Sequence, residues 1–386
     1  MTLDNIQQIA CVGGGVIGSS WAIQFAMKGL STTLYDINQE QLDKSESQMH
    51  KSLDALEQYQ AITPQQRREL TERITLTTSI EEAVKNAQFI QESGPERLEI
   101  KQSILAQVEQ YAAPDAVYAS STSGLLITDI AAKASHPERC VGAHPYNPPH
   151  LIPLVELTSG KTTSPEILTL VYAFYQSIGK EAVLLRRECP GFIANRLQLA
   201  LYREVQDLVM RGVCSVEDAD KALVYGPGLR WAIFGHNMIM QLGNPGGLTG
   251  MVQMLGSSGD RWLEDMASWT HQPDNWAEVA QPGVDQEMAH FPDHVGHTNA
   301  PPIGTGCSLS CSSSTGSCKR CDPWTCKPFP AAAGCACALH CSSASAPGSG
   351  TPGAYCKTPS SPGSAGLTPA LPWPIPLRWS APPWPH

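Results

Sequence analysis

The chain has 386 residues, of which 36 are acidic and 26 basic, and its net charge is −10 with histidine neutral. This length is sufficient for two ordinary domains, and the acidic balance argues against nucleic acid as a partner, because phosphate binding needs clustered lysine and arginine. No stretch approaches the roughly 18 apolar residues of a membrane span, and residues 1–8 lack the pattern of a secretory signal. We therefore expect a cytoplasmic protein that acts on a small molecule and binds neither membranes nor nucleic acid.

The first predicted elements are two strand–helix pairs. Residues 6–12 form an apolar run that predicts a short buried strand, and glycines follow it. Residues 16–27 then carry apolar side chains four apart, which is typical of one face of a helix. Residues 31–35 predict a second strand, which ends at Asp36, and residues 39–56 predict a long polar helix.

Further strand candidates follow, with helical stretches between several of them. They are residues 88–91, 116–119, 140–143, 154–157 and 182–185. Alternation of strands and helices is typical of an α/β fold with a mainly parallel, doubly wound sheet. We therefore predict a doubly wound α/β domain of the Rossmann type over residues 1–187.

After Pro190 the pattern becomes helical. Apolar residues between Phe192 and Val209 form a broad stripe on a predicted helix of about 20 residues. Residues 215–218, Ser-Val-Glu-Asp, resemble a capping box that opens another helix. No strong strand follows, so we predict a smaller all-helical domain over residues 188–290.

Residues 291–386 differ in kind, because they hold 17 of the 31 prolines, nine of the 13 cysteines and no glutamate. Such a segment cannot bury enough apolar surface to offset the entropy of ordering it, so we predict a disordered tail. Cys318 and Cys321 have the spacing of zinc ligands, but the packing residues and second ligand pair of a zinc module are missing, and we predict no metal site. The composition also suggests the hypothesis that the tail is an out-of-frame reading of GC-rich DNA.

A glycine motif joins the first predicted strand to the first predicted helix. Gly13, Gly15 and Gly18 fit the pattern G-x-G-x-x-G in the expected strand–turn–helix context. The first glycine permits a tight turn, the second lets the backbone approach a pyrophosphate, and the third lets the helix pack on the sheet. Free amides at the start of the helix, around Val16 and Ile17, favour phosphate binding. The motif therefore predicts a dinucleotide site, with an ordinary strand-to-helix turn as the alternative.

Asp36 indicates which dinucleotide is bound. It lies 23 residues past Gly13, where a carboxylate can bind the adenosine ribose hydroxyls. This charge would repel a 2′-phosphate, and neither Ile37 nor Asn38 is basic, so NAD is favoured over NADP. FAD uses a similar turn, but the further contact segments of flavoproteins are not found. We therefore predict NAD as the cofactor.

Four polar residues follow the nucleotide-binding half. Ser123 comes after a predicted strand, His144 ends one, Glu156 lies within an apolar strand, and Asn195 begins the helical domain. Removing a hydride from an alcohol carbon needs a base for the hydroxyl proton, and a histidine suits that role. A carboxylate on its far nitrogen would fix the tautomer, and Ser and Asn can hydrogen-bond the reacting oxygen. On spacing alone, a structural histidine at a strand end is the alternative.

Over roughly residues 5–270, these motifs resemble the 3-hydroxyacyl-CoA dehydrogenase family, in which a Glu twelve residues after the base His is its partner. The family also has a Ser 21 residues before that His and an Asn after a Pro-Gly-Phe turn. The resemblance implies four catalytic residues, namely Ser123, His144, Glu156 and Asn195. It also implies that Glu96 and Lys101 contact NAD.

Residues 91–99, 121–126 and 226–232 resemble the branch that contains lambda-crystallin (L-gulonate 3-dehydrogenase) and L-carnitine dehydrogenase. The acyl-CoA enzymes commonly have Phe-Phe after the catalytic His, whereas this chain has Pro145-Tyr146. The resemblance therefore favours a small free L-3-hydroxy acid, with a 3-hydroxyacyl-CoA as the alternative. Arg230 is a candidate for holding a substrate carboxylate, with a structural ion pair as the alternative.

The resemblance also implies a homodimer that is completed by C-terminal helices. The likeness fades before residue 291, where the tail begins, and a missing final helix would expose apolar surface. Two alternatives to an active enzyme follow. One is a catalytically silent, crystallin-like structural or NAD-binding protein, and the other is an inactive product with an altered C-terminus.

Overall fold

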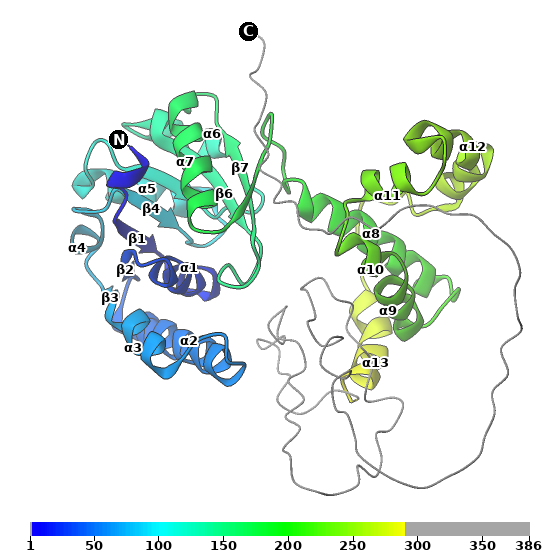
Figure 1. The fold of residues 1–386 in the computed structure, drawn as a ribbon, viewed down its shortest axis with the longest axis horizontal. Helices are drawn as coiled ribbons and strands as arrows, with labels where there is room; N and C mark the ends of the chain where they lie inside the picture. The colour runs from blue at the N-terminus through cyan, green and yellow to red at the C-terminus, as the bar shows by residue number, and fades with distance from the viewer. Residues whose placement is uncertain (1, 290–386) are drawn as a thin grey trace, which may run out of the picture. The chain divides into compact units, whose positions relative to one another are not determined.

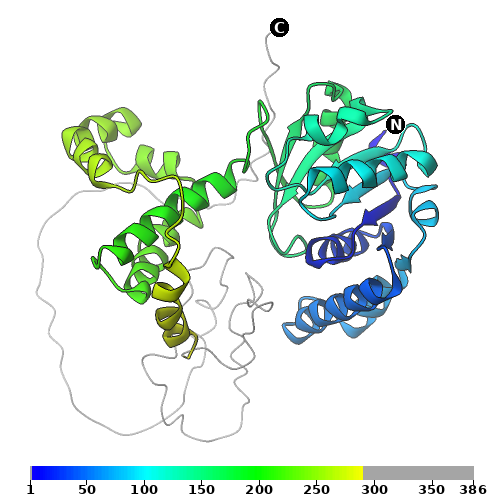
Figure 2. The same ribbon diagram turned by 180° about the vertical axis from the view of Figure 1, so that it is seen from behind.

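The structure is a computed structural model that describes residues 2–289 (Figures 1 and 2). The predictions for residues 291–386, their disorder and lack of a metal site, lie outside the described residues. Within residues 2–289, no helix is long and apolar enough to cross a membrane. In the same range, no group of three or more His, Cys, Asp or Glu side chains is placed to hold a metal ion.

An eight-stranded sheet organises the first part of the chain, in the order β3-β2-β1-β4-β5-β6-β7-β8. Neighbouring strands are parallel, except that β6 and β7 are antiparallel. Because β2 and β4 lie on opposite sides of β1, the sheet is wound in both directions from β1, which confirms the predicted fold class. The strands are β1 (Gln8–Val12), β2 (Ser31–Tyr35), β3 (Ile74–Thr77), β4 (Phe89–Glu92), β5 (Val117–Ser120), β6 (Cys140–Pro145), β7 (Leu154–Ser159) and β8 (Glu181–Leu184).

The edge strand β3 is the strand that the sequence pattern did not predict. It has four residues, Ile-Thr-Leu-Thr, and its side chains are half-buried or exposed rather than alternating between core and solvent. A short edge strand of this kind produces only a weak period-2 signal. The predicted strands agree with the observed ones within two residues at each end. Strand β6 is longer than predicted, so His144 lies inside it rather than at its end.

Helices cover both faces of the sheet, and alternate strand residues point into two separate apolar cores. Ile9 and Cys11 face the core that α1, α2, α3 and α7 cover, whereas Ala10 and Val12 face the core that α4, α5 and α6 cover. The side of α1 and α7 faces the viewer in Figure 1, and that of α5 faces the viewer in Figure 2. The helices are α1 (Val16–Met27), α2 (Gln39–Gln58), α3 (Pro64–Glu72), α4 (Ile80–Val84), α5 (Leu98–Tyr111), α6 (Ile127–Ile130) and α7 (Pro165–Ser177), with short 3₁₀ turns at Leu3–Asn5, Ala131–Lys133 and Pro137–Arg139.

An aromatic cluster fixes α1 on the sheet. The rings of Trp21 and Phe25 stack with centroids 5.2 Å apart, and those of Phe89 and Phe174 lie 4.4 Å apart. Tyr175 completes the cluster, and its hydroxyl donates to Gln91 Oε1 at 2.5 Å. Buried aromatic pairs of this kind stabilise packing beyond the area that they bury. They hold α1 against the sheet and against α7.

The rest of the described chain is helical. The helices are α8 (Ala194–Met210), α9 (Val216–Leu223), a π turn η4 (Val224–Gly228), α10 (Leu229–Trp231), α11 (His236–Leu242), α12 (Gly247–Asp265) and α13 (Trp276–Met288). As predicted, Ser215 caps α9, and its hydroxyl accepts the N–H of Asp218 at 3.0 Å. Helix α13 packs against α8 and α9, and α11 packs against α12. Many apolar side chains stay accessible, because Leu197, Leu199 and Trp262 are 68%, 54% and 62% exposed.

Candidate active site

The glycine turn connects β1 to α1 and is shaped by its own packing. Gly13 has a φ of 99°, which favours glycine. A Cβ on Gly13 would lie 2.8 Å from the carbonyl oxygen of Ser93, and one on Gly18 would lie 1.7 Å from the carbonyl oxygen of Gly13. A Cβ on Gly15 would meet no atom within 4 Å. The turn therefore leaves open space at Gly15, where a pyrophosphate can approach the N-terminus of α1.

Asp36 lies directly after β2, beside this turn. Its Oδ2 accepts the N–H of Gly14 at 2.7 Å, and its Oδ1 accepts the N–H of Ile37 at 2.7 Å. These bonds hold the carboxylate next to the first turn of α1, which begins at Val16 and continues with Ile17. A carboxylate in this place suits the adenosine ribose hydroxyls of NAD and repels the 2′-phosphate of NADP. The residues present therefore fit NAD.

His144 and Glu156 face each other across the antiparallel pair β6–β7, where they occupy paired positions in the register. His144 Nδ1 and Glu156 Oε2 are 3.1 Å apart, and the two residues are 6% and 1% exposed. The other carboxylate oxygen, Oε1, accepts the N–H groups of Ile193 and Ala194 at 2.8 and 3.0 Å. Both oxygens of this buried carboxylate therefore have partners, as burial requires. The arrangement leaves His144 Nε2 directed away from Glu156.

A tight turn after β8 brings the start of α8 to this pair. Gly191 and Phe192 have φ values of 77° and 51°, and the second is unusual for a bulky residue. The Phe192 ring is 3% exposed and stacks on His144 with centroids 5.0 Å apart. Helix α8 begins directly after this turn, at Ala194, in the region of the predicted apolar stripe. Its second residue, Asn195, has Nδ2 3.5 Å from His144 Nε2.

Glu96 shapes the loop that carries Ser123. Its Oε1 accepts the Thr122 hydroxyl at 2.7 Å and the backbone N–H groups of Ser123 and Gly124 at 2.9 and 2.8 Å. Burial raises the pKa of Glu96, but the hydrogen bonds from Thr122, Gly124 and Leu125, together with the charge of Lys101, outweigh it, and the pKa is lowered. An ionised Glu96 therefore holds the Ser123 loop in place at neutral pH.

Lys101 is buried beneath this loop, and the sequence did not indicate its main partner. Its ammonium is 1% exposed and lies 2.8 Å from Oε1 of Glu92, which is fully buried, and 3.5 Å from Glu96 Oε2. The Ser120 hydroxyl also donates to Glu92, at 2.5 Å. The predicted contact of Lys101 with NAD stays a prediction. The sequence signal that could have indicated the role of Glu92 is its place as an acidic residue at the end of the buried strand β4.

The loop between β6 and β7 is held by contacts with α1 and with the start of β8. His150 Nδ1 and the Ser20 hydroxyl on α1 are 2.7 Å apart, and the same hydroxyl accepts the N–H of His150 at 3.0 Å. The ammonium of Lys180 donates to the carbonyl oxygen of Pro149, and to that of Ile152 at 2.7 Å. These contacts hold the loop beside the first turns of α1.

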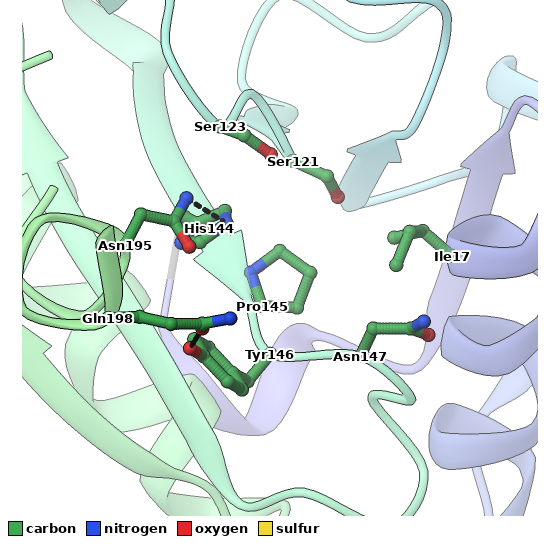
Figure 3. Close-up of a pocket in the computed structure, with 9 residues that line it drawn as sticks. All are labelled: Ile17, Ser121, Ser123, His144, Pro145, Tyr146, Asn147, Asn195 and Gln198. Atoms are coloured by element: carbon green, nitrogen blue, oxygen red, sulfur yellow. Dashed lines mark hydrogen bonds between the residues drawn. The ribbon is translucent and has the colours of Figure 1, made fainter. Parts of the chain in front are cut away.

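A cavity of about 310 Å³ lies where these segments meet (Figure 3). The predicted residues Ser123, His144 and Asn195 line it together, and Glu156 lies behind His144. Arg230 is not among the described residues that line this cavity, and its side chain is exposed on α10. The lining residues are Ile17, Ser121, Ser123, His144, Pro145, Tyr146, Asn147, Asn195 and Gln198.

Two family models match almost all of the described chain. Residues 8–189 match the NAD-binding domain of 3-hydroxyacyl-CoA dehydrogenase, and residues 191–281 match its C-terminal domain. The chain belongs to the 3-hydroxyacyl-CoA dehydrogenase family. As a member of this family, it is an NAD-dependent oxidoreductase, which confirms the predicted family, enzyme class and cofactor.

Curated relatives place this family member in the L-carnitine dehydrogenase-like branch. The L-carnitine dehydrogenase of Streptomyces coelicolor is 38% identical over 287 residues, which cover 74% of this chain and 85% of the relative. The 3-hydroxyacyl-CoA dehydrogenase of Gibberella moniliformis is also 38% identical, over 73% of this chain and 87% of the relative. Among solved structures, 5-formyl-3-hydroxy-2-methylpyridine 4-carboxylic acid 5-dehydrogenase has a TM-score of 0.60 and 29% identity, over 72% of this chain and 86% of its own.

Proposed function

We propose that this dehydrogenase oxidises the 3-hydroxyl of a small L-3-hydroxy acid to the 3-oxo product. The observation that carries the proposal is the buried His144–Glu156 pair, with its nitrogen and oxygen 3.1 Å apart. The pair lies at a cavity that Ser123 and Asn195 also line, and that reaches Ile17 in the first turn of α1. A base, its orienting carboxylate and two neutral hydrogen-bonding groups therefore meet next to the nucleotide turn.

In the proposed reaction, Nε2 of His144 takes the proton of the substrate hydroxyl. Glu156 holds the proton on Nδ1, which keeps Nε2 available as a base, and stabilises the imidazolium once it has formed. Asn195 and Ser123 donate hydrogen bonds to the substrate oxygen as it becomes a carbonyl. Bound NAD supplies the acceptor for the hydride that leaves carbon 3.

We propose that the glycine turn and Asp36 hold the cofactor, the turn at the pyrophosphate and the carboxylate at the ribose. Glu96, which is partly exposed beside Ser123, is the proposed contact on the nicotinamide side. Lys101 is proposed to act there through Glu96, because its ammonium is buried and paired with Glu92. The proposed cofactor residues are Gly13, Gly15, Val16, Ile17, Gly18, Asp36, Glu96 and Lys101. The domain division that goes with this proposal is residues 1–187 for NAD and residues 188–290 for substrate binding and dimerisation.

The His144→Gln variant tests the proposed base. We expect a fall in kcat of about 10²–10⁴, because general base catalysis contributes about that much, while the affinity for NAD stays unchanged. The assay follows NADH absorbance with a panel of L-3-hydroxy acids and 3-hydroxyacyl-CoA esters. Near-normal turnover by this variant would exclude His144 as the base.

L-carnitine is the first substrate to test, because several relatives at 37–40% identity are named L-carnitine dehydrogenase. A gulonate-like acid and a 3-hydroxyacyl-CoA are the alternatives, and a CoA ester would place the enzyme in fatty acid metabolism. The relative kcat/KM values of the wild-type chain for these three substrates decide among them.

We propose that the chain is a cytoplasmic homodimer. The exposed apolar side chains of Leu197, Leu199 and Trp262 support a partner for the helical region, and the four cysteines within residues 2–289 are free. Sedimentation of the full chain, with and without Leu199→Glu, tests the dimer. NAD binding without turnover of any substrate would favour the silent, crystallin-like role, and a cooperative thermal transition that NAD moves upward would argue against an inactive product.

A further inference from the structure

The cavity must accommodate more of the substrate than its reacting hydroxyl group. A 3-hydroxy acid or its thioester carries a second oxygen centre at carbon 1, two carbons from the oxidised carbon. The nine lining residues include no Lys, Arg, Asp or Glu. Among the lining residues, the candidate partners of that second oxygen are therefore neutral N–H or O–H donors.

Gln198 has a position that suits this role. It follows Asn195 by three residues on α8, and residues with this spacing share one face of a helix, with Cβ atoms about 5–6 Å apart. If Asn195 meets the oxygen on carbon 3, the neighbouring position on the same face meets a group two carbons along the substrate. Figure 3 draws Gln198 and Asn195 on the same side of the cavity.

Tyr146 sets the orientation of the Gln198 amide. Its hydroxyl donates a hydrogen bond to Oε1 of Gln198, and a phenol has only this one proton to donate. With its oxygen held by Tyr146, the amide turns its NH₂ group toward the cavity, as Figure 3 shows. Both N–H donors can then bind a carbonyl or carboxylate oxygen.

The other polar groups on the wall are less suitable. The Ser121 hydroxyl accepts from Gln91 Nε2 at 2.9 Å and lies 3.0 Å from the Ser93 hydroxyl, so it already has two partners within the protein. Asn147 lies on the side of Ile17, toward the nucleotide turn (Figure 3). Among the lining residues, Gln198 is therefore the N–H donor beside Asn195 on α8 that the proposed chemistry does not already use.

We propose that Gln198, oriented by Tyr146, binds the carbon-1 oxygen of the substrate and selects 3-hydroxy acids and their thioesters over alcohols that lack this oxygen. The inference rests on the proposed function and assigns a specificity-determining residue to the same site. Gln198 binds the substrate directly, whereas Tyr146 is a positioning residue that acts through the Gln198 amide.

The test compares two substrates that differ only at carbon 1: L-carnitine, and an analogue with a methyl group in place of the carboxylate. Gln198→Met removes both donors and keeps the length of the side chain. We expect the preference for L-carnitine, as the ratio of the two kcat/KM values, to fall about tenfold or more, since a hydrogen bond to a charged group is worth about that factor. The change should lie in KM, with kcat within about threefold of wild type.

Three further variants refine the test. Tyr146→Phe should change the preference in the same direction by a smaller factor, because the amide keeps its donors but loses its orientation. Gln198→Glu should weaken the binding of the free acid more than the binding of 3-hydroxybutyryl-CoA, since a carboxylate repels another carboxylate but not a neutral thioester. Gln176→Met is the matched control. It removes a Gln–Tyr hydrogen bond, from Gln176 Nε2 to the Tyr172 hydroxyl at 3.0 Å, on α7 outside the cavity, and should leave the preference unchanged.

The outcomes separate this inference from the proposed function. If the wild-type chain oxidises L-carnitine or the thioester but Gln198→Met keeps the wild-type preference, the inference alone fails. If the wild-type chain oxidises none of the acids and thioesters, the proposed function fails, and the inference fails with it. A variant that lowers kcat equally on both members of the substrate pair, with unchanged KM, would also overturn the assignment.

Discussion

Replacing Glu156 by Gln exchanges one carboxylate oxygen for an NH₂ group and tests the orientation of His144. The carboxylate accepts three hydrogen bonds, from His144 Nδ1 at 3.1 Å and from the N–H groups of Ile193 and Ala194 at 2.8 and 3.0 Å. A glutamine has one accepting oxygen and one donating NH₂ group. Its oxygen should face the two backbone N–H groups, since the opposite orientation would leave both of them buried without an acceptor.

With that orientation, the NH₂ group faces His144 Nδ1. The ring must then accept at Nδ1, so its proton moves to Nε2, which can no longer take the substrate proton. We expect kcat to fall by about 10²–10⁴, which is the usual contribution of a general base. The two backbone N–H groups keep their acceptor. Leaving them buried without an acceptor would destabilise the folded state by about 1–3 kcal/mol each. The melting temperature should therefore change by only a few degrees.

Steady-state NADH formation, thermal melting and the dissociation constant for NAD are measured on Glu156→Gln and wild type. Glu109→Gln is the matched control, because Glu109 accepts the N–H groups of Ser135 and His136, both at 2.8 Å, away from the cavity. The control should keep wild-type kcat. A Glu156→Gln variant with kcat within about threefold of wild type would refute the tautomer argument, and one that loses its cooperative transition would give Glu156 a structural role instead.

Three further predictions concern the cofactor turn and the pH dependence of stability. Asp36→Ala should weaken NAD binding about tenfold and reduce the preference for NAD over NADP, because it removes the acceptor for the ribose hydroxyls. Equal affinities of the variant and the wild type for NAD, measured by fluorescence titration, would contradict this. Gly18→Ala should destabilise the fold by about 3 kcal/mol or more in denaturant titrations, since the added Cβ would lie 1.7 Å from the carbonyl oxygen of Gly13. An unfolding midpoint equal to that of wild type would show that the turn relaxes without cost. Burial and the charge of Lys180 lower the pKa of His150 from 6.5 to about 4. The unfolded chain therefore binds more protons between these two values, so the stability from neutral His150 is complete above pH 6.5 and falls by about 3 kcal/mol as the pH drops to about 4. His150→Gln should flatten this part of the pH profile, and a slope equal to that of wild type would assign it to other groups.

Much of the fold could be predicted from the sequence, because its signals are local. Buried strands read as apolar runs, and the glycine pattern places a turn between β1 and α1 whatever the rest of the chain does. The pairing of His144 with Glu156 was also accessible, since a residue type, a spacing of twelve and a family resemblance agreed on it. The antiparallel register of β6 and β7 then brings the two side chains together.

Only the tertiary structure decided the contacts between segments that are far apart in the sequence. Glu96 accepts the N–H of Ser123 across 27 positions, and Tyr146 meets Gln198 across 52. Neither contact leaves a periodic signal in the sequence, because it depends on how separate elements pack together. The positive φ of Phe192, which stacks its ring on His144 and brings Asn195 to the imidazole, belongs to the same class. Local propensity acts over a few residues, whereas the geometry of the site is set by packing that joins the whole domain.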